Sequence, residues 1–215
     1  MTLRKDEYEI RRISYREAME VVVREHYLHR RSPCSAAFGL YHINSQKLCG
    51  VVVYGTPSSA PLRKGIAGEK YANEVVELTR LWCDPDVPKN GESFLIGNTV
   101  RKSGKPIVVS FADASQGHIG YVYQATNWIY TGLSAKRTNW TIEGVNLHCQ
   151  TIADKYTADD LREKFGDRFT LQPRPRKHRY LFINAKASER KAIMRAIKYP
   201  VLPYPKATVF DGVAP

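Results

Sequence analysis

The sequence predicts a mixed α/β fold, in which a β-sheet carries helices on both faces and a basic insertion is appended. Apolar runs typical of strands alternate with amphipathic helical stretches, and IVVSFAD at residues 107–113 is apolar almost throughout. Such a run is usually buried on both faces, as in the centre of a mixed sheet. With 215 residues, 43% of them hydrophobic, the chain is long enough for one elaborated domain with a substantial core.

The first half of the chain contains one helix and three strands by these criteria. Ser14 and Glu17 have capping-box spacing, and apolar residues then repeat at helical intervals. Two short apolar runs follow as a hairpin, and a segment rich in Pro, Gly and Ser follows them. The elements predicted here are a helix over 15–25, strands over 36–41 and 48–55, a loop over 56–73, and a strand over 74–83.

The second half continues the alternation and then changes character. Asn90 is positioned to cap a helix, and Thr157 and Gly166 mark the two ends of another. The elements predicted here are a helix over 91–102, a strand over 107–113, a helix over 117–128, two short strands about 143–144, a helix within 157–166, a strand over 179–184, and a helix over 188–199 capped by Ser188. We therefore divide the chain into a core over 1–132, a basic insertion over 133–179, and a last strand, helix and tail over 180–215.

Positive charge is concentrated towards the C-terminus. The net charge is +12; residues 1–132 hold 17 Lys and Arg against 13 Asp and Glu, and residues 133–215 hold 16 against 8. This asymmetry favours a polyanion such as nucleic acid over a merely solvated basic surface. Prolines keep PRPRKHR, residues 173–179, extended along a phosphate backbone. The predicted DNA-binding residues are Lys136, Arg137, Arg174, Arg176, Lys177, His178 and Arg179.

The cysteines and the apolar runs exclude other classes. Four scattered cysteines without CxxC spacing argue against a zinc ribbon or a disulfide framework. No apolar run approaches the roughly 20 residues that span a bilayer, and the N-terminus lacks the apolar stretch of a signal peptide. We expect a cytoplasmic protein.

Asp113 is the main candidate for a functional side chain. It ends the apolar strand 107–113, and ligands of open α/β sheets bind at the carboxyl ends of strands. The alternative is that Asp113 only caps the following segment. Ser110, three residues earlier, is either interior packing or a hydrogen-bond acceptor.

Four sequence blocks together resemble the Mom family of phage DNA-modification proteins. They are HYLHRR, VVELTRLWCDPDVPKNGESFLI, VVSFADASQGHIGYVYQATNWIYTG and KHRYLF, within about residues 20–183. The element order is similar to the GNAT-type N-acyltransferase fold. The resemblance implies a phage enzyme that converts adenine in double-stranded DNA to N6-carbamoylmethyladenine (methylcarbamoyladenine). This would protect the DNA from host restriction in the infected cell. An acyl-CoA-like donor and iron dependence are also implied.

The resemblance assigns roles to the long third block. An exocyclic amine conjugated to its ring is a poor nucleophile, so a carboxylate such as Asp113 would hold or deprotonate the adenine amine. In the parent fold a tyrosine on the following helix often acts as general acid, and Tyr123 or Tyr130 is the candidate; core packing is the alternative. Asn127 and Trp128 would read or stack a flipped base.

Further candidates lie near the first helix and the 74–93 segment. His26 and Tyr27 are catalytic candidates, and His26 and His29 with Asp113 would form a two-histidine, one-carboxylate iron site. The alternative for a histidine at a helix end is a structural role beside the helix dipole. The predicted donor-binding residues are Arg80, Asn90 and Ser93.

The glycine-rich pyrophosphate loop of the parent fold is absent. Residues 83–93 contain one glycine and three acidic side chains, which oppose a polyphosphate. Two other functions therefore stay open: a non-catalytic nucleic-acid-binding protein on this fold, and an acetyltransferase acting on another amine. The second explains the fold but not the charge asymmetry.

Overall fold

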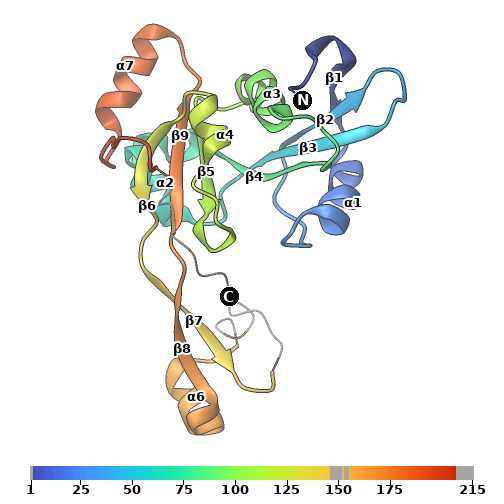
Figure 1. Ribbon diagram of the computed structural model, residues 1–215. Helices are drawn as coiled ribbons and strands as arrows, with labels where there is room; N and C mark the ends of the chain where they lie inside the picture. The colour runs from blue at the N-terminus through green and yellow to red at the C-terminus, as the bar shows by residue number, and fades with distance from the viewer. Residues whose placement is uncertain (1, 146–151, 153–154, 207–215) are drawn as a thin grey trace.

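The computed structural model describes residues 2–145, 152 and 155–206 of the chain. Helices are interspersed among the strands along it (Figure 1). The strands are β1 Tyr8–Ile13, β2 Ala36–His42, β3 Leu48–Gly55, β4 Val75–Cys83, β5 Ile107–Asp113, β6 Ile129–Leu133, β7 Arg137–Ile142, β8 Phe169–Arg174 and β9 Lys177–Ile183. The α-helices are α1 Tyr15–Glu25, α2 Ala60–Ala67, α3 Gly91–Thr99, α4 Tyr121–Ala125, α6 Ala158–Phe165 and α7 Ala187–Ala196. The 3-10 helices are Lys5–Glu7, Glu69–Glu74, Val100–Lys102, Ala114–Gln116 and Gly166–Arg168.

Among the described residues, seven strands form one mixed sheet in the order β1-β2-β3-β4-β5-β9-β6. Only β4 and β5 pair in parallel; the other neighbours are antiparallel. β5 lies inside the sheet, and most of its residues are buried, as its apolar sequence predicts. The predicted mixed sheet with flanking helices is confirmed.

Helices cover both faces of the sheet, and three apolar clusters hold them there. Val22 of α1 packs with Val51 and Val53 of β3 on one face. Leu95 of α3 packs with Val52 on the other. On the second half of the sheet, α2 and α7 share a cluster with β5 and β9. Burying one such aliphatic side chain stabilises the fold by about 1.5–3 kcal/mol.

The parallel pair β4–β5 separates partway along its length. The two strands are in register only from Val75 opposite Ile107 to Glu77 opposite Val109. Beyond these residues β4 continues to Cys83 and β5 to Asp113 without pairing to each other. The sheet therefore opens between the carboxyl halves of these strands, where ligands of open α/β sheets bind.

A bulge in β4 changes which residues share a face. Val53 pairs with Arg80 and Tyr54 pairs with Leu78, so Thr79 is the extra residue. Alternation would place Leu78, Arg80 and Trp82 on one face. In the structure Leu78 joins the α3-side cluster and Trp82 packs against the α1-side cluster.

The segment after β6 forms a separate two-stranded ribbon (Figure 1). Among the described residues, β7 pairs with β8, from Arg137 opposite Arg174 to Ile142 opposite Phe169, and neither strand joins the main sheet. The ribbon and α6 extend away from the main sheet and enclose a small core of their own. β9 begins at Lys177, so the last residues of the predicted insertion lie in the main sheet.

Local signals located most of the predicted elements. Ser14 accepts a hydrogen bond from the Glu17 amide and begins α1 as predicted, although the Glu17 carboxylate binds Tyr41 instead of closing a capping box. Thr157 and Asp160 form a complete capping box for α6, which ends before Gly166. α7 begins after Lys186 rather than at Ser188.

Two predictions of secondary structure are wrong, and a third is tested only in part. Residues 56–73 are not a loop: Ser59 caps α2, which has a proline in its first turn, and a 3-10 helix follows. The helix predicted over 117–128 is limited to Tyr121–Ala125, since Asn127 adopts a left-handed φ of 59° and β6 follows. The strand pair predicted about 143–144 is the third: β7 ends just before these residues, and Ile142 forms an antiparallel bridge to Val145 across them. β7 also pairs with β8, and the rest of the predicted second strand lies outside the described residues.

Across the residues that the model describes, none of the helices has the length and hydropathy needed to cross a membrane.

Candidate active site

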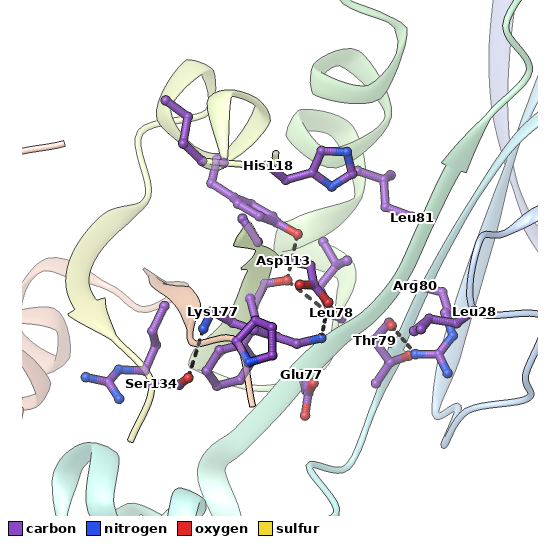
Figure 2. Close-up of a pocket in the computed structure, with 18 of the residues that line it drawn as sticks. Leu28, Glu77, Leu78, Thr79, Arg80, Leu81, Asp113, His118, Ser134 and Lys177 are labelled. Atoms are coloured by element: carbon purple, nitrogen blue, oxygen red, sulfur yellow. Dashed lines mark hydrogen bonds and ion pairs between the residues drawn. The ribbon is translucent and has the colours of Figure 1, made fainter. Parts of the chain in front are cut away.

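A cavity of about 770 Å³ occupies the opening between β4 and β5 (Figure 2). Its walls come from residues 26–28 just after α1, the start of α2, the middle of β4, Glu92 of α3, the last residues of β5, residues 117–123, and the start of β9. Arg137 and Arg174, at the base of the ribbon, also line it. The volume is within the usual range for small-molecule sites.

Asp113 is held in an ion pair at the end of β5. Its Oδ2 lies 2.6 Å from the Lys177 ammonium, and its Oδ1 accepts hydrogen bonds from the amide and hydroxyl of Ser115. Burial raises the pKa of Asp113, but the hydrogen bonds from Lys177 and Ser115 outweigh it and leave the pKa below its usual value. A carboxylate held in this way is a weak base. Asp113 caps the 3-10 helix that follows it and also lines the cavity, so its two predicted positions do not exclude each other.

Glu77 is a second carboxylate in the cavity. It stands on β4 at the point where β4 and β5 separate, and in Figure 2 it lies below the Lys177 ammonium. Burial raises its pKa to about 7, against the opposing effect of Arg80 and Lys177. A carboxyl that titrates near neutral pH is suited to accept a proton. Sequence reasoning missed it, although an acidic residue within an apolar strand was a visible signal.

Tyr123 and Ser110 meet at the inner wall of the cavity. The two hydroxyl oxygens are 2.8 Å apart, and Ser110 Oγ is 3.0 Å from the Leu78 carbonyl oxygen. A serine has one proton and a carbonyl only accepts. If Ser110 donates to Leu78, then Tyr123 donates to Ser110 and its proton points into the protein. Burial also raises the pKa of Tyr123 well above its usual value.

His26, Tyr27 and His118 form an aromatic rim to the cavity. The rings of His26 and Tyr27 are stacked at 4.4 Å, and His118 meets the Tyr27 ring edge-on at 6.4 Å. His26 is buried, and burial together with Arg80 lowers its pKa to about 4, so it is neutral at pH 7. Tyr27 is 43% exposed, which leaves its ring available to a ligand.

Gly120 fixes the loop that carries His118. Its φ is +86°, and a Cβ there would lie 2.4 Å from the Tyr180 ring. The Tyr180 hydroxyl in turn donates to the Ile119 carbonyl. Only glycine therefore allows residues 117–120 to lie against β9, and His118 stands in this loop, before the start of α4.

Two arginines of the cavity wall are already engaged. Arg80 donates to the carbonyl oxygens of Thr79, Arg30 and Arg31 and so holds the segment after α1. Arg179 is buried, donates to the hydroxyl and carbonyl of Thr131, and lies 3.4 Å from the centroid of the Tyr199 ring. Both guanidinium groups shape the cavity and neither is free.

The structure does not assemble the predicted iron site. Over residues 2–145, 152 and 155–206, no three His, Cys, Asp or Glu side chains are grouped as metal ligands would be. His29 is exposed, and its Nδ1 is 3.0 Å from the Val23 carbonyl oxygen. His26 Nδ1 accepts from the Leu28 amide. The residues present do not fit a non-haem iron centre.

The segment between β4 and α3 does not fit a CoA pyrophosphate. The Asp86 amide donates to the Asp84 carboxylate and the Val87 amide to the Asp84 carbonyl, so these donors are used. Gly91 serves packing, because a Cβ there would lie 2.3 Å from Val87. Asn90 occupies the N-cap position without a side-chain bond, and neither it nor Ser93 lines the cavity. Their predicted role in donor binding has no support.

Three other predicted site residues lie away from the cavity. Trp128 is fully buried in the core, so it cannot stack on a base. Asn127 is exposed on a separate shallow hollow beside Arg101. Tyr130 stands on β6, with its hydroxyl 2.9 Å from His178 Nδ1, and does not line the cavity.

The predicted DNA-binding residues divide into two groups. Lys136, Arg137 and Arg174 are exposed near the cavity mouth. The others have internal partners: Arg176 donates to the Ser134 and Leu133 carbonyls, and Lys177, His178 and Arg179 bind Asp113, Tyr130 and Thr131. The buried Arg179 is misassigned as a phosphate contact.

A mixed sheet that opens between two parallel strands over carboxylates, with arginines at the mouth, defines a ligand-binding α/β protein with a polar cavity. The chain belongs to the Mom protein family, whose model matches residues 7–206. The resemblance inferred from the four sequence blocks is thereby confirmed.

One curated protein and several solved structures are similar to the chain. The methylcarbamoylase Mom of Escherichia phage Mu is 28% identical over 147 residues, which is 66% of this chain and 60% of that protein. The matched region thus spans less than two thirds of the curated relative. Among solved structures, ribosomal-protein-S5-alanine acetyltransferase from Vibrio fischeri matches with a TM-score of 0.47 and 10% identity, over 86% of this chain and 98% of that one. A spermidine N-acetyltransferase mutant from Vibrio cholerae gives 0.48 and 10%, over 87% and 99%.

Proposed function

We propose that this protein is a phage transferase that converts adenine in double-stranded DNA to N6-carbamoylmethyladenine and so protects the DNA from host restriction. It would act in the cytoplasm of the infected bacterium. Membership of the Mom family and the methylcarbamoylase relative support the reaction. The observation that carries the proposal is the cavity, which is lined both by Glu77, a carboxylate of near-neutral pKa, and by the exposed Arg137 and Arg174.

Adenine would enter this cavity as a flipped base. The N6 amine is paired inside a duplex, so an enzyme that acts on it must expose the base first. Tyr27 and His118 form an aromatic rim on which a base can stack, the role predicted for Trp128. Lys136, Arg137 and Arg174 would contact the phosphates beside the flipped nucleotide.

Glu77 would supply the base that the amine requires. As the N6 nitrogen bonds to the carbamoylmethyl carbon of an electrophilic donor, the donor's leaving group departs with the bonding electrons. The nitrogen then releases a proton, which Glu77 accepts. Asp113, ionised and paired with Lys177, would position Lys177 and add a fixed dipole at the cavity wall.

A comparison of three chains tests this function. Wild type, Glu77→Gln and Glu189→Gln are expressed in bacteria, and the DNA is digested to nucleosides for mass analysis. The control changes an exposed glutamate on α7 in the same chemical way. We expect modified deoxyadenosine with wild type and the control, and a loss of at least about 100-fold with Glu77→Gln. Equal modification by Glu77→Gln would reject Glu77 as the base, and unmodified DNA in all three would reject the function.

A further inference from the structure

The ribbon of β7 and β8 has two chemically distinct faces. Paired residues of an antiparallel ribbon share a face, and successive residues alternate. The register therefore places Thr138, Trp140, Ile142, Phe169, Leu171 and Pro173 on one face, called the apolar face. It places Arg137, Asn139, Thr141, Thr170, Gln172 and Arg174 on the other, called the polar face.

The apolar face packs against α6 and forms the core of the ribbon. Ile142 and Phe169 are buried with Leu161 of α6, and Trp140 packs edge-on against Phe169. On the polar face, Thr170, Gln172 and both arginines are exposed. The hydroxyls of Thr141 and Thr170 bond across the strands at 2.7 Å, which holds the two strands in register. Among the described residues, the exposed side chains of this face are therefore polar or basic, and the six residues that form its ladder include no acidic one.

The polar face is continuous with the cavity. Arg137 and Arg174 form the first pair of the ladder and also line the cavity mouth. From that pair the ladder runs outward through Gln172 to the threonine pair. Four residues of strand span about 13 Å, which corresponds to about four base-pair steps. DNA with a base in the cavity would therefore place neighbouring base pairs on one side of that base along this face.

The chemistry of the ladder matches base edges. A two-stranded ribbon fits the major groove, and glutamine and threonine are donors and acceptors for base edges there. Glutamine makes a two-bond contact with adenine. Arg137 and Arg174, at the inner end of the ladder, keep the phosphate contacts proposed above.

We propose that the polar face of the ribbon lies in the major groove and reads the sequence on one side of the target adenine, with Gln172 contacting a base edge. This rests on the proposed function for the position of the target base. The inference assigns sequence choice to the ribbon and chemistry to the cavity, so the two can be separated by experiment.

The test uses the full-length protein and a pool of duplexes with a target adenine fixed at the centre and random bases on both sides of it. Flanking preferences are read twice, from the bound fraction and from the fraction carrying a modified adenine. For wild type we expect a preference confined to about four base pairs on one side. Gln172→Ala should lower discrimination at one of these positions by roughly tenfold. The control is Thr138→Ala, because Thr138 is exposed but lies on the apolar face of the ribbon. This variant should keep the wild-type preference.

A substitution that changes the preference guards against a folding defect. Glutamate accepts a hydrogen bond from cytosine but cannot donate to adenine N7, so Gln172→Glu should shift the favoured base at that position from adenine towards cytosine. An unchanged preference in both Gln172 variants, or a wild-type preference spread equally over both sides, would overturn the proposal. If no adenine is modified but the bound fraction shows the expected preferences, the ribbon assignment stands and the proposed reaction fails.

Discussion

Replacing Glu77 by glutamine should remove activity and make the folded protein more stable at alkaline pH. The pKa of Glu77 is raised from its usual 4.5 to about 7 by burial. Between these values the folded chain holds a proton that the unfolded chain has released. The free energy of unfolding therefore falls as pH rises through this window and levels off above pH 7.

The expected size follows from that pKa. The full rise corresponds to about 3 kcal/mol, at about 1.4 kcal/mol per pH unit. Glu77 is partly open to the cavity, which reduces the expected effect to about 1–2 kcal/mol. Glutamine is nearly isosteric and uncharged, so Glu77→Gln should match wild type near pH 5 and exceed it by this amount near pH 8.

Urea unfolding of both chains at the two pH values measures this difference directly. Glu189→Gln serves as the control and should show no such pH-dependent gain, because Glu189 is exposed. A variant that is less stable than wild type at both pH values would refute the reasoning, since Glu77 would then be a satisfied structural carboxylate.

Three further predictions follow from the contacts of the cavity wall. Lys177→Ala and Asp113→Ala should each lower the free energy of unfolding by about 3 kcal/mol, because each leaves one partner of the ion pair uncompensated. A double-mutant cycle measured by urea unfolding should show a coupling energy of at least about 1 kcal/mol, and additive effects would contradict the ion pair. Tyr123→Phe should lower the free energy of unfolding by about 1 kcal/mol but leave the extent of DNA modification within about tenfold of wild type, because the Tyr123 hydroxyl is bonded to Ser110. A loss of modification as large as that of Glu77→Gln would instead support Tyr123 as a proton donor. Arg179→Lys should lower the free energy of unfolding by about 1–2 kcal/mol and leave the salt dependence of DNA binding unchanged. Arg174→Glu should instead weaken DNA binding and reduce the dependence of its affinity on salt. The opposite pattern would show that Arg179 contacts phosphate and Arg174 does not.

Features that depend on local chemistry were predictable from the sequence. The buried strand 107–113 follows from its apolar run, and the pocket position of Asp113 follows from its place at the strand end. The capping residues Ser14 and Thr157 locate two helices correctly. Each of these depends on residues within a few positions of one another.

Local composition misled where two signals competed. The 56–73 segment contains a serine cap followed by Pro61, a good helix start, but its prolines and glycines indicated a loop. The aromatics after Tyr123 looked helical, but the left-handed Asn127 ends that stretch and sends Trp128 into the core. The type of an aromatic residue therefore does not show whether it will face the cavity or the core once the chain has turned.

Glu77 and the basic PRPRKHR segment depend on tertiary structure. The role of Glu77 exists because β4 and β5 separate beside it, which no local pattern encodes. Likewise, a count of basic residues does not distinguish Arg174, exposed at the ribbon, from Arg179, which is buried against Thr131 and Tyr199. Which basic side chains find hydrogen-bond partners inside the protein depends on the pairing of strands that are distant in the sequence.

The measurement that tests the central claim most directly is the identity of the nucleoside formed when the purified protein, supplied with host-cell extract as the source of donor, acts on duplex DNA. Mass and fragmentation spectra show which base gains a group and at which atom. We predict a carbamoylmethyl group on adenine N6 with wild type and its loss with Glu77→Gln. Ordinary deoxyadenosine alone, or a group on any other base, would contradict a role for the β4–β5 cavity in adenine modification.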